Sequence, residues 1–241
     1  MGKRKLDMTE EERQESDLYL KKPAPHTVVK HQIDQQKKLI VVLERANIEI
    51  VKAGKNYELL NCDHHMGLIR KYKKDLKDCR PDILHQCLLM LQDSPLNQAG
   101  MLQVYIHTEK NVLIDIDPQC RIPRTFKRFA GLMVQLLQRL CVRSSESNKK
   151  LMKVIKNPVS DHLPVGCRKI GTSYDCGNCV QPSELVPKDD KPIVIVVGAM
   201  AHGKAEMDFI EETYAISQYH LSGALACAKI CTAFEQSWGI L

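Results

Sequence analysis

Long hydrophobic runs are missing from this chain of 241 residues, although 44% of its residues are hydrophobic. No uninterrupted apolar stretch approaches the roughly 20 residues that a membrane-spanning helix needs, which argues against a helical membrane protein. The first residues, Met1–Leu6, lack the serine or threonine of a myristoylation signal and do not resemble a secretory signal peptide. We therefore expect no membrane attachment, and a protein of the cytoplasm or nucleus.

Cysteine is not scarce, because the chain has ten of them, but their spacing lacks the pattern of a metal site. Cys176-Gly177-Asn178-Cys179 is a single C-x-x-C pair, whereas a zinc site needs a second pair at a suitable distance. Cys227 and Cys231 are far away in the sequence. We expect no metal, and a reduced intracellular protein with free, mostly buried thiols.

The chain divides by composition into a polar tail, residues 1–37, and a folded part, residues 38–241. The tail is rich in lysine and glutamate and is expected to be disordered, with a weak nuclear address in Lys3-Arg4-Lys5. The net charge of +6 and the pI of about 8.7 favour anionic partners such as nucleic acid, although many ordinary proteins match them.

Apolar patterns in the folded part alternate between strands and helices. Runs without polar interruption or with β-branched residues predict strands at 39–43, 102–108, 112–116 and 193–197, the second and third forming a hairpin. Helices are expected from about residue 44, over 80–91, over 124–142 and over 222–238. Strands that alternate with helices predict an α/β fold with a mainly parallel sheet.

Acidic residues are absent between Asp117 and Glu146, an interval with six basic ones. Arg124 and Arg128 lie one helical turn apart and share a face, and Arg121 lies just before them. Guanidinium groups pair with phosphate oxygens in a fork, so this stretch suits RNA or DNA contacts. A solvated face with acidic partners from distant sequence remains an alternative. Few aromatics interrupt the stretch, which argues against base stacking of the RRM type.

A glycine loop, Gly198 to Ala205, follows the most apolar predicted strand. It fits the phosphate-binding pattern G-x-x-x-x-G-K up to Lys204, but Ala205 has no hydroxyl to bind magnesium. Only 36 residues follow Ala205, too few to complete the sheet of a nucleotide hydrolase. The loop is therefore either a ligand loop at a strand's carboxyl end or a structural turn. A second ligand-loop candidate is 216–221.

Nine segments together resemble the Emg/Nep family of eukaryotic ribosome-biogenesis proteins, which are SPOUT-class pseudouridine N1-methyltransferases. These segments are Leu39–Glu44, Tyr57–Asp63, Arg80–Ile83, Asp93–Asn97, Leu102–Ile106, Arg121–Phe126, Gly131–Leu137, Lys153–Pro158 and Val197–Lys204. The resemblance covers about residues 38–241. It implies a SPOUT-type α/β fold with inserted hairpin and helical segments and a C-terminal trefoil knot that binds the cofactor, at about 167–241.

The resemblance also implies S-adenosylmethionine as cofactor, a homodimer, small-subunit rRNA or pre-rRNA as substrate, ribosomal proteins or assembly factors as partners, and a nuclear, nucleolar location. The implied cofactor contacts are Thr172, Gly198, Gly203, Ile216, Ser217, Gln218, Tyr219, His220 and Leu221. The implied RNA contacts are Arg80, Arg121, Arg124 and Arg128. The family's cofactor loop usually has asparagine and proline where this chain has Gln218 and His220, which loosens the loop.

The implied reaction transfers a methyl group to N1 of a pseudouridine that is flipped out of its stack. Asp82 is expected to orient Arg80, and an acid paired with arginine has a lowered pKa that makes it a poor base. We therefore expect Arg80 to stabilise the negative charge that develops on the base. The competing hypothesis is an RNA-binding assembly factor without catalysis, which the arginines favour equally and the glycine loop does not.

Overall fold

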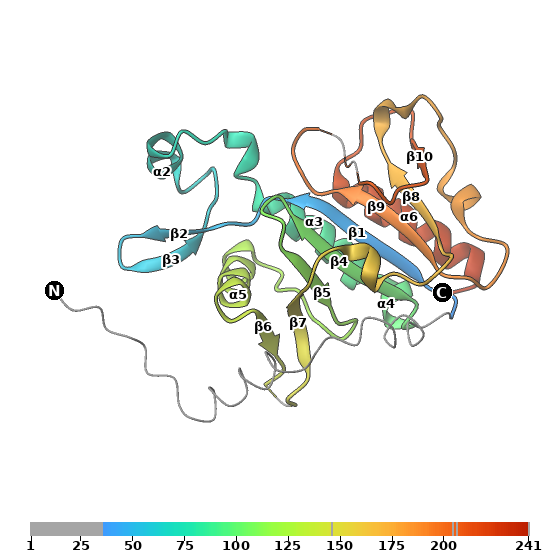
Figure 1. Ribbon diagram of the computed structural model, residues 1–241, viewed down its shortest axis with the longest axis horizontal. Helices are drawn as coiled ribbons and strands as arrows, with labels where there is room; N and C mark the ends of the chain where they lie inside the picture. The colour runs from blue at the N-terminus through green and yellow to red at the C-terminus, as the bar shows by residue number, and fades with distance from the viewer. Residues whose placement is uncertain (1–35, 146, 204, 206, 241) are drawn as a thin grey trace. The chain divides into compact units, whose positions relative to one another are not determined.

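The computed structural model describes residues 36–145, 147–203, 205 and 207–240 (Figure 1). The expected disordered tail, 1–37, lies almost wholly outside the described residues, as does Lys204 of the glycine loop. Among the described residues no helix is both long and apolar enough to cross a membrane.

The centre of the fold is an eight-stranded sheet in the order β10-β8-β9-β1-β4-β5-β7-β6. β10, β8, β9, β1 and β4 run parallel to one another, whereas β5, β7 and β6 add an antiparallel edge that begins at the β4–β5 pair. The sheet strands are β1 (Leu39–Ala46), β4 (Leu102–Thr108), β5 (Leu113–Ile116), β6 (Cys141–Arg143), β7 (Lys150–Ile155), β8 (Arg168–Thr172), β9 (Ile193–Gly198) and β10 (Glu212–Tyr214). The expected α/β fold with a mainly parallel sheet is confirmed.

Both faces of the parallel part are covered, which explains why its central strands are apolar throughout. On one face Leu39, Val41 and Leu43 of β1 belong to a core shared with α3 (Pro81–Gln92) and α6 (Gly223–Trp238). On the other face Ile40 and Val42 pack in a second cluster, against the short 3-10 helix η3 (Val159–His162) and the segment around Phe209. The same two-sided burial accounts for β9, whose residues 193–197 are all buried.

The helix expected from residue 44 is wrong. β1 continues to Ala46 because Glu44 pairs with Gly198 and Ala46 pairs with Thr108, both from distant strands. A separate hairpin follows, β2 (Ile50–Ala53) and β3 (Asn56–Leu59), and Gly54 takes a φ of +62° in its turn. The hairpin and the short helix α2 (Met66–Lys71) form an insertion between β1 and α3 with its own small core of Val51, Leu60, Ile69 and Cys79.

The remaining long helices lie where the sequence predicts them, and one of them, α5, ends earlier than expected. α3 begins at Pro81 and α6 at Gly223, where Ser222 caps the helix by accepting a hydrogen bond from the amide of Leu225 at 3.2 Å. α4 (Pro95–Gln98) is a single turn, and η2 (Leu76–Asp78), η4 (Tyr174–Cys176) and η5 (Pro182–Leu185) are 3-10 turns. α5 (Phe126–Arg139) ends before the expected residue 142, because Leu140 takes a left-handed φ of 60° and the chain enters β6.

Candidate active site

A cavity of about 360 Å³ opens beyond the carboxyl ends of β8 and β9. In open parallel sheets this is the edge where ligands bind. All the predicted cofactor residues except Gln218 line it: Thr172, Gly198, Gly203, Ile216, Ser217, Tyr219, His220 and Leu221. The two candidate loops, far apart in the sequence, thus belong to one cavity, as the family resemblance implied and as the local sequence patterns alone did not show.

Glycines let the backbone approach closely around this cavity. A Cβ atom on Gly223, at the first turn of α6, would lie 3.0 Å from the carbonyl oxygen of Gly198 and from Sγ of Cys87. Gly203 takes a φ of +107°, and a Cβ there would lie 2.9 Å from the guanidinium of Arg45. The end of β9 and the start of α6 are therefore packed at a distance that a side chain would not allow, whereas glycine is needed at position 203 for its positive φ.

The turn after β8 also lines the cavity, and the sequence reasoning missed it. Thr172 donates a side-chain hydrogen bond to the carbonyl of Val196 at 2.9 Å, which ties the end of β8 to β9. The next turn carries Ser173, Tyr174 and Asp175 into the lining, and the ring of Tyr174 lies against that of His220 with centroids 3.5 Å apart. The ring pair joins the turn after β8 to the 216–221 loop. His220 therefore contributes a contact that holds this loop in place.

Arg80 and Asp82 form the pair that was expected at the start of α3. The guanidinium donates two hydrogen bonds to the carboxylate, at 2.8 and 2.7 Å. These bonds hold the pKa of the Asp82 carboxyl below its usual value. Asp82 is therefore ionised at neutral pH, suited to orienting Arg80 rather than to accepting a proton.

Of the other three arginines, Arg121 and Arg124 lie in the segment before α5 and Arg128 lies in its first turn, and one of them has a partner. Nε2 of His85 on α3 donates to the carbonyl of Pro123 at 2.7 Å, which places the Arg121–Arg124 segment beside α3. Arg124 is paired with Asp93 at 2.5 Å, an acid outside its local sequence. Within the described chain, Arg121 and Arg128 are exposed and make no ion pair. The basic stretch is thus partly a paired face, as the alternative held, and partly available to phosphate.

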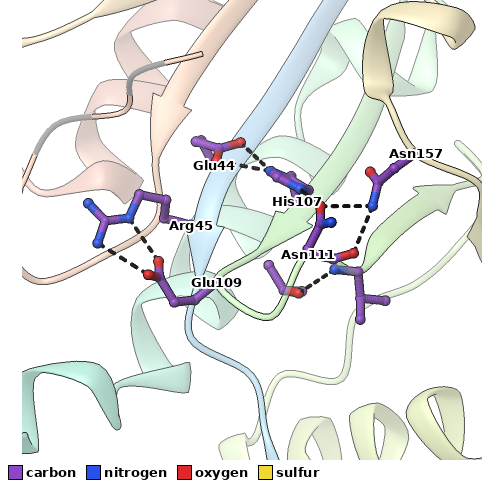
Figure 2. A network of polar contacts seen from close by, with 8 residues as sticks. Glu44, Arg45, His107, Glu109, Asn111 and Asn157 are labelled. Carbon is purple, nitrogen blue, oxygen red and sulfur yellow. Dashed lines mark hydrogen bonds and ion pairs between the residues drawn. The ribbon is translucent and has the colours of Figure 1, made fainter. Parts of the chain in front are cut away.

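The sequence did not point to a polar network at the ends of β1 and β4 (Figure 2). Its Arg45 lies close to Gly203. The buried Glu44 carboxylate lies 2.9 Å from Nδ1 of His107, whose Nε2 lies 2.9 Å from Oδ1 of Asn111. The hydrogen bond to Glu44 raises the pKa of His107. Beside it, Arg45 donates to Glu109 at 2.8 Å.

The cysteines show no arrangement for a metal. Within the described residues no group of three or more histidine, cysteine, aspartate or glutamate side chains could hold an ion. All ten cysteines are free thiols, and six of them are buried. Cys176 and Cys179 lie near the outer end of the turn after β8, where Cys179 is exposed.

Comparison with known proteins identifies relatives along most of the chain. The EMG1/NEP1 methyltransferase family matches residues 41–235. "Ribosomal RNA small subunit methyltransferase NEP1" of Mus musculus is 60% identical over 205 residues, 85% of this chain and 84% of the relative. The protein of the same name from Drosophila melanogaster is 55% identical over 213 residues, 86% of this chain and 84% of the relative.

A solved structure has the same fold. Archaeoglobus fulgidus Nep1 bound to S-adenosylhomocysteine matches with a TM-score of 0.69 at 22% identity, over 85% of this chain and 99% of that chain. This likeness bears out the fold class that the sequence resemblance implied. With a family match over most of its length and relatives above half identity, the chain belongs to the EMG1/NEP1 methyltransferase family.

Proposed function

We propose that this protein methylates N1 of a pseudouridine in small-subunit ribosomal RNA, with S-adenosylmethionine as methyl donor. The observation that carries the proposal is the cavity at the carboxyl edge of the sheet, which joins the Gly198–Gly203 loop to the 216–221 loop. Relatives at 55–60% identity are named as small-subunit rRNA methyltransferases, which supports the substrate class. The similar archaeal structure with S-adenosylhomocysteine supports the cofactor.

The cavity fits a nucleoside-sized cofactor. Its volume of about 360 Å³ lies within the usual range of small-molecule sites, roughly 300–1,000 Å³. Gly198 and Gly203 would bring backbone close to the ligand, and Ile216 and Leu221 supply apolar lining on the other side. When bound there, the cofactor supplies a methyl group on a positively charged sulfur. The residues of this chain would hold it in line with the attacking nitrogen, and positioning of that kind can supply much of a rate enhancement.

Arg80 is the residue to which we assign the chemistry on the RNA side. As the N1 proton leaves, negative charge develops on the base, and a fixed guanidinium stabilises it. Asp82 holds the Arg80 side chain by two hydrogen bonds, so little reorganisation is needed when the base arrives. Arg121, Arg124 and Arg128 would position the RNA backbone, with Arg124 exchanging Asp93 for a phosphate group.

The assembly and location expected from the resemblance are part of the proposal. Met90 on α3 and Leu225 on α6 expose 42% and 48% of their surface on helices that pack together, which suits a second copy of the chain as a homodimer partner. Binding to rRNA would bring the protein to the nucleolus and to ribosomal proteins or assembly factors there.

The decisive experiment is methyl transfer to a short RNA hairpin, with pseudouridine compared against uridine at one position. We expect transfer only to pseudouridine, and equal transfer to uridine would refute the N1 assignment. Arg80→Ala should abolish turnover while titration calorimetry shows nearly unchanged cofactor affinity. If the wild-type protein gives no heat with millimolar S-adenosylmethionine, the scaffold hypothesis is favoured instead.

A further inference from the structure

A second cavity lies at the other end of α3 from Arg80. Its volume is about 990 Å³, and it is formed by the last turn of α3, the turn around α4 and the extended segment that leads to α5. Arg121 and Arg124 are part of its lining, and the proposed reaction gives them no task beyond backbone contact. The cavity is therefore a part of the basic surface without an assigned ligand.

The wall of this cavity holds a buried acceptor without a partner in the described part of the chain. Asn97 and Gln92 are 5% and 7% exposed. The Nδ2 group of Asn97 donates to the carbonyls of Gln92 at 3.0 Å and Pro118 at 2.9 Å, which fixes the orientation of its amide. Its Oδ1 then accepts no hydrogen bond from any described residue. Such orphaned buried groups are uncommon in proteins and call for an explanation.

Gln92 supplies the complementary group. Its Oε1 lies 3.3 Å from Nδ2 of Asn97, so its Nε2 points away from that contact. Within the described chain Nε2 has no protein acceptor, and it is open to solvent rather than buried. A donor and an acceptor on adjacent side chains match the edge of a nucleic-acid base, which Asn and Gln side chains recognise by paired hydrogen bonds. Pro118, Ile122 and Pro123 supply apolar surface in the same lining for the face of a base.

The rim of the cavity supplies charge for a phosphate group. Arg124 is 75% exposed at its side chain and is held by Asp93 alone among the described residues. Arg121, also exposed, has no carboxylate partner in the described part of the chain. Two guanidinium groups beside an orphaned acceptor and an available amide donor are the combination that one nucleotide needs, with the phosphate outside and the base inside.

We propose that this cavity binds an unstacked base of the RNA strand that carries the target nucleotide. The inference rests on the proposed function, since it takes the same RNA as ligand. α3 has 12 residues, and at 1.5 Å per residue it separates the cavity from Arg80 by about 18 Å. Because stacked nucleotides rise about 3.4 Å each and unstacked ones span more, a strand that runs straight from the target reaches the cavity within about five nucleotides.

The test is an abasic scan combined with one variant. Wild-type protein and Gln92→Leu are titrated with fluorescent hairpins in which single nucleotides within five positions of the target lack their base. We expect one abasic position to weaken wild-type binding about tenfold, the size of a paired hydrogen-bond contact with a base. Gln92→Leu should weaken binding of the intact hairpin to a similar extent and leave the affinity for that abasic hairpin unchanged. Gln138→Leu, an exposed glutamine on α5, is the matched control.

Additive losses from Gln92→Leu and the abasic position would overturn the proposal, because they would show two independent contacts. The proposal would also be overturned if removing a base at every position other than the target left the affinity of the wild-type protein unchanged. That result depends on the wild-type protein alone, so it does not require a variant to fold. Methyl transfer by the wild-type protein is measured on the same hairpins. If methyl transfer is absent while the abasic scan gives the expected result, only the proposed function is refuted, because the scan measures RNA binding and not catalysis.

Discussion

The Glu44–His107 pair allows a quantitative prediction because its hydrogen bonds fix a protonation state (Figure 2). Nδ2 of Asn157 donates to the backbone carbonyl of Asn111 at 2.7 Å and to Oδ1 of Asn111 at 2.9 Å. That oxygen is therefore an acceptor, and Nε2 of His107 must donate to it. Nδ1 faces the Glu44 carboxylate, so it must donate as well. With both nitrogens donating, His107 is an imidazolium paired with a carboxylate.

Replacing His107 by leucine should remove about 3–5 kcal/mol from the free energy of unfolding, because it leaves a buried charge without a partner. The side chain of Glu44 is 6% exposed, so water cannot replace the lost contact. A second substitution, Glu44→Gln, removes that charge. In the leucine background it should recover about 2 kcal/mol, whereas in the wild type it should be destabilising.

The stabilisation by the Glu44–His107 pair should decrease as the pH rises. The pKa of His107 is raised in the folded protein from its ordinary 6.5, so the pair stabilises fully below that value. The contribution is lost as the pH rises through the raised pKa. Urea unfolding of wild type and His107→Leu across this window should show the gap between them shrinking towards high pH. Additive effects of the two substitutions, or a gap that grows with pH, would refute the assignment of a charged pair.

Three further predictions concern the cavities and the last helix. Gly223→Ala should cost about 1–3 kcal/mol in urea unfolding and weaken cofactor binding in calorimetry, because its Cβ would lie 3.0 Å from the Gly198 carbonyl. Asp93→Asn should raise RNA affinity several-fold at low salt, since it frees Arg124, while the melting temperature stays nearly unchanged. An unaltered affinity in anisotropy titrations would contradict a phosphate role for Arg124. Ser222→Ala removes the side-chain cap of α6 and should cost about 1 kcal/mol, or roughly 2–4 °C in melting temperature.

The long strands could be predicted because their own residues carry the signal. Every residue of 39–43 and 193–197 is buried, so an unbroken apolar run was enough. The outer strands β8 and β10 carry no such signal. Arg168 of β8 is polar in sequence and finds its partner in Glu212 of β10, 44 residues further on, at 2.5 Å. The end of β1 was missed for the same reason, since Glu44, where a helix was expected to begin, is paired with a histidine from β4.

The site was predictable where backbone geometry defines it and not where side chains meet across elements. Gly198 and Gly203 could be located from a strand that ends in glycine. The contact of Tyr174 with His220 depends on two loops that only the fold brings together. The partner of Arg124 was likewise invisible to a local count of charges, because Asp93 lies before the hairpin of β4 and β5.

The contact between α3 and α6 links the two halves of the site. A Cβ atom on Gly223 would lie 3.0 Å from Sγ of Cys87, on the second turn of α3, and 3.0 Å from the carbonyl oxygen of Gly198. The cofactor cavity and the helix that starts at Arg80 thus meet at one glycine. Interiors packed this tightly transmit small displacements instead of absorbing them. A shift of α6 that widens the cofactor cavity must therefore move α3, and with it both Arg80 at one end and Gln92 at the other. In the proposed function, the spacing between the methyl donor, the target base and the second cavity would therefore depend on how α3 packs on α6.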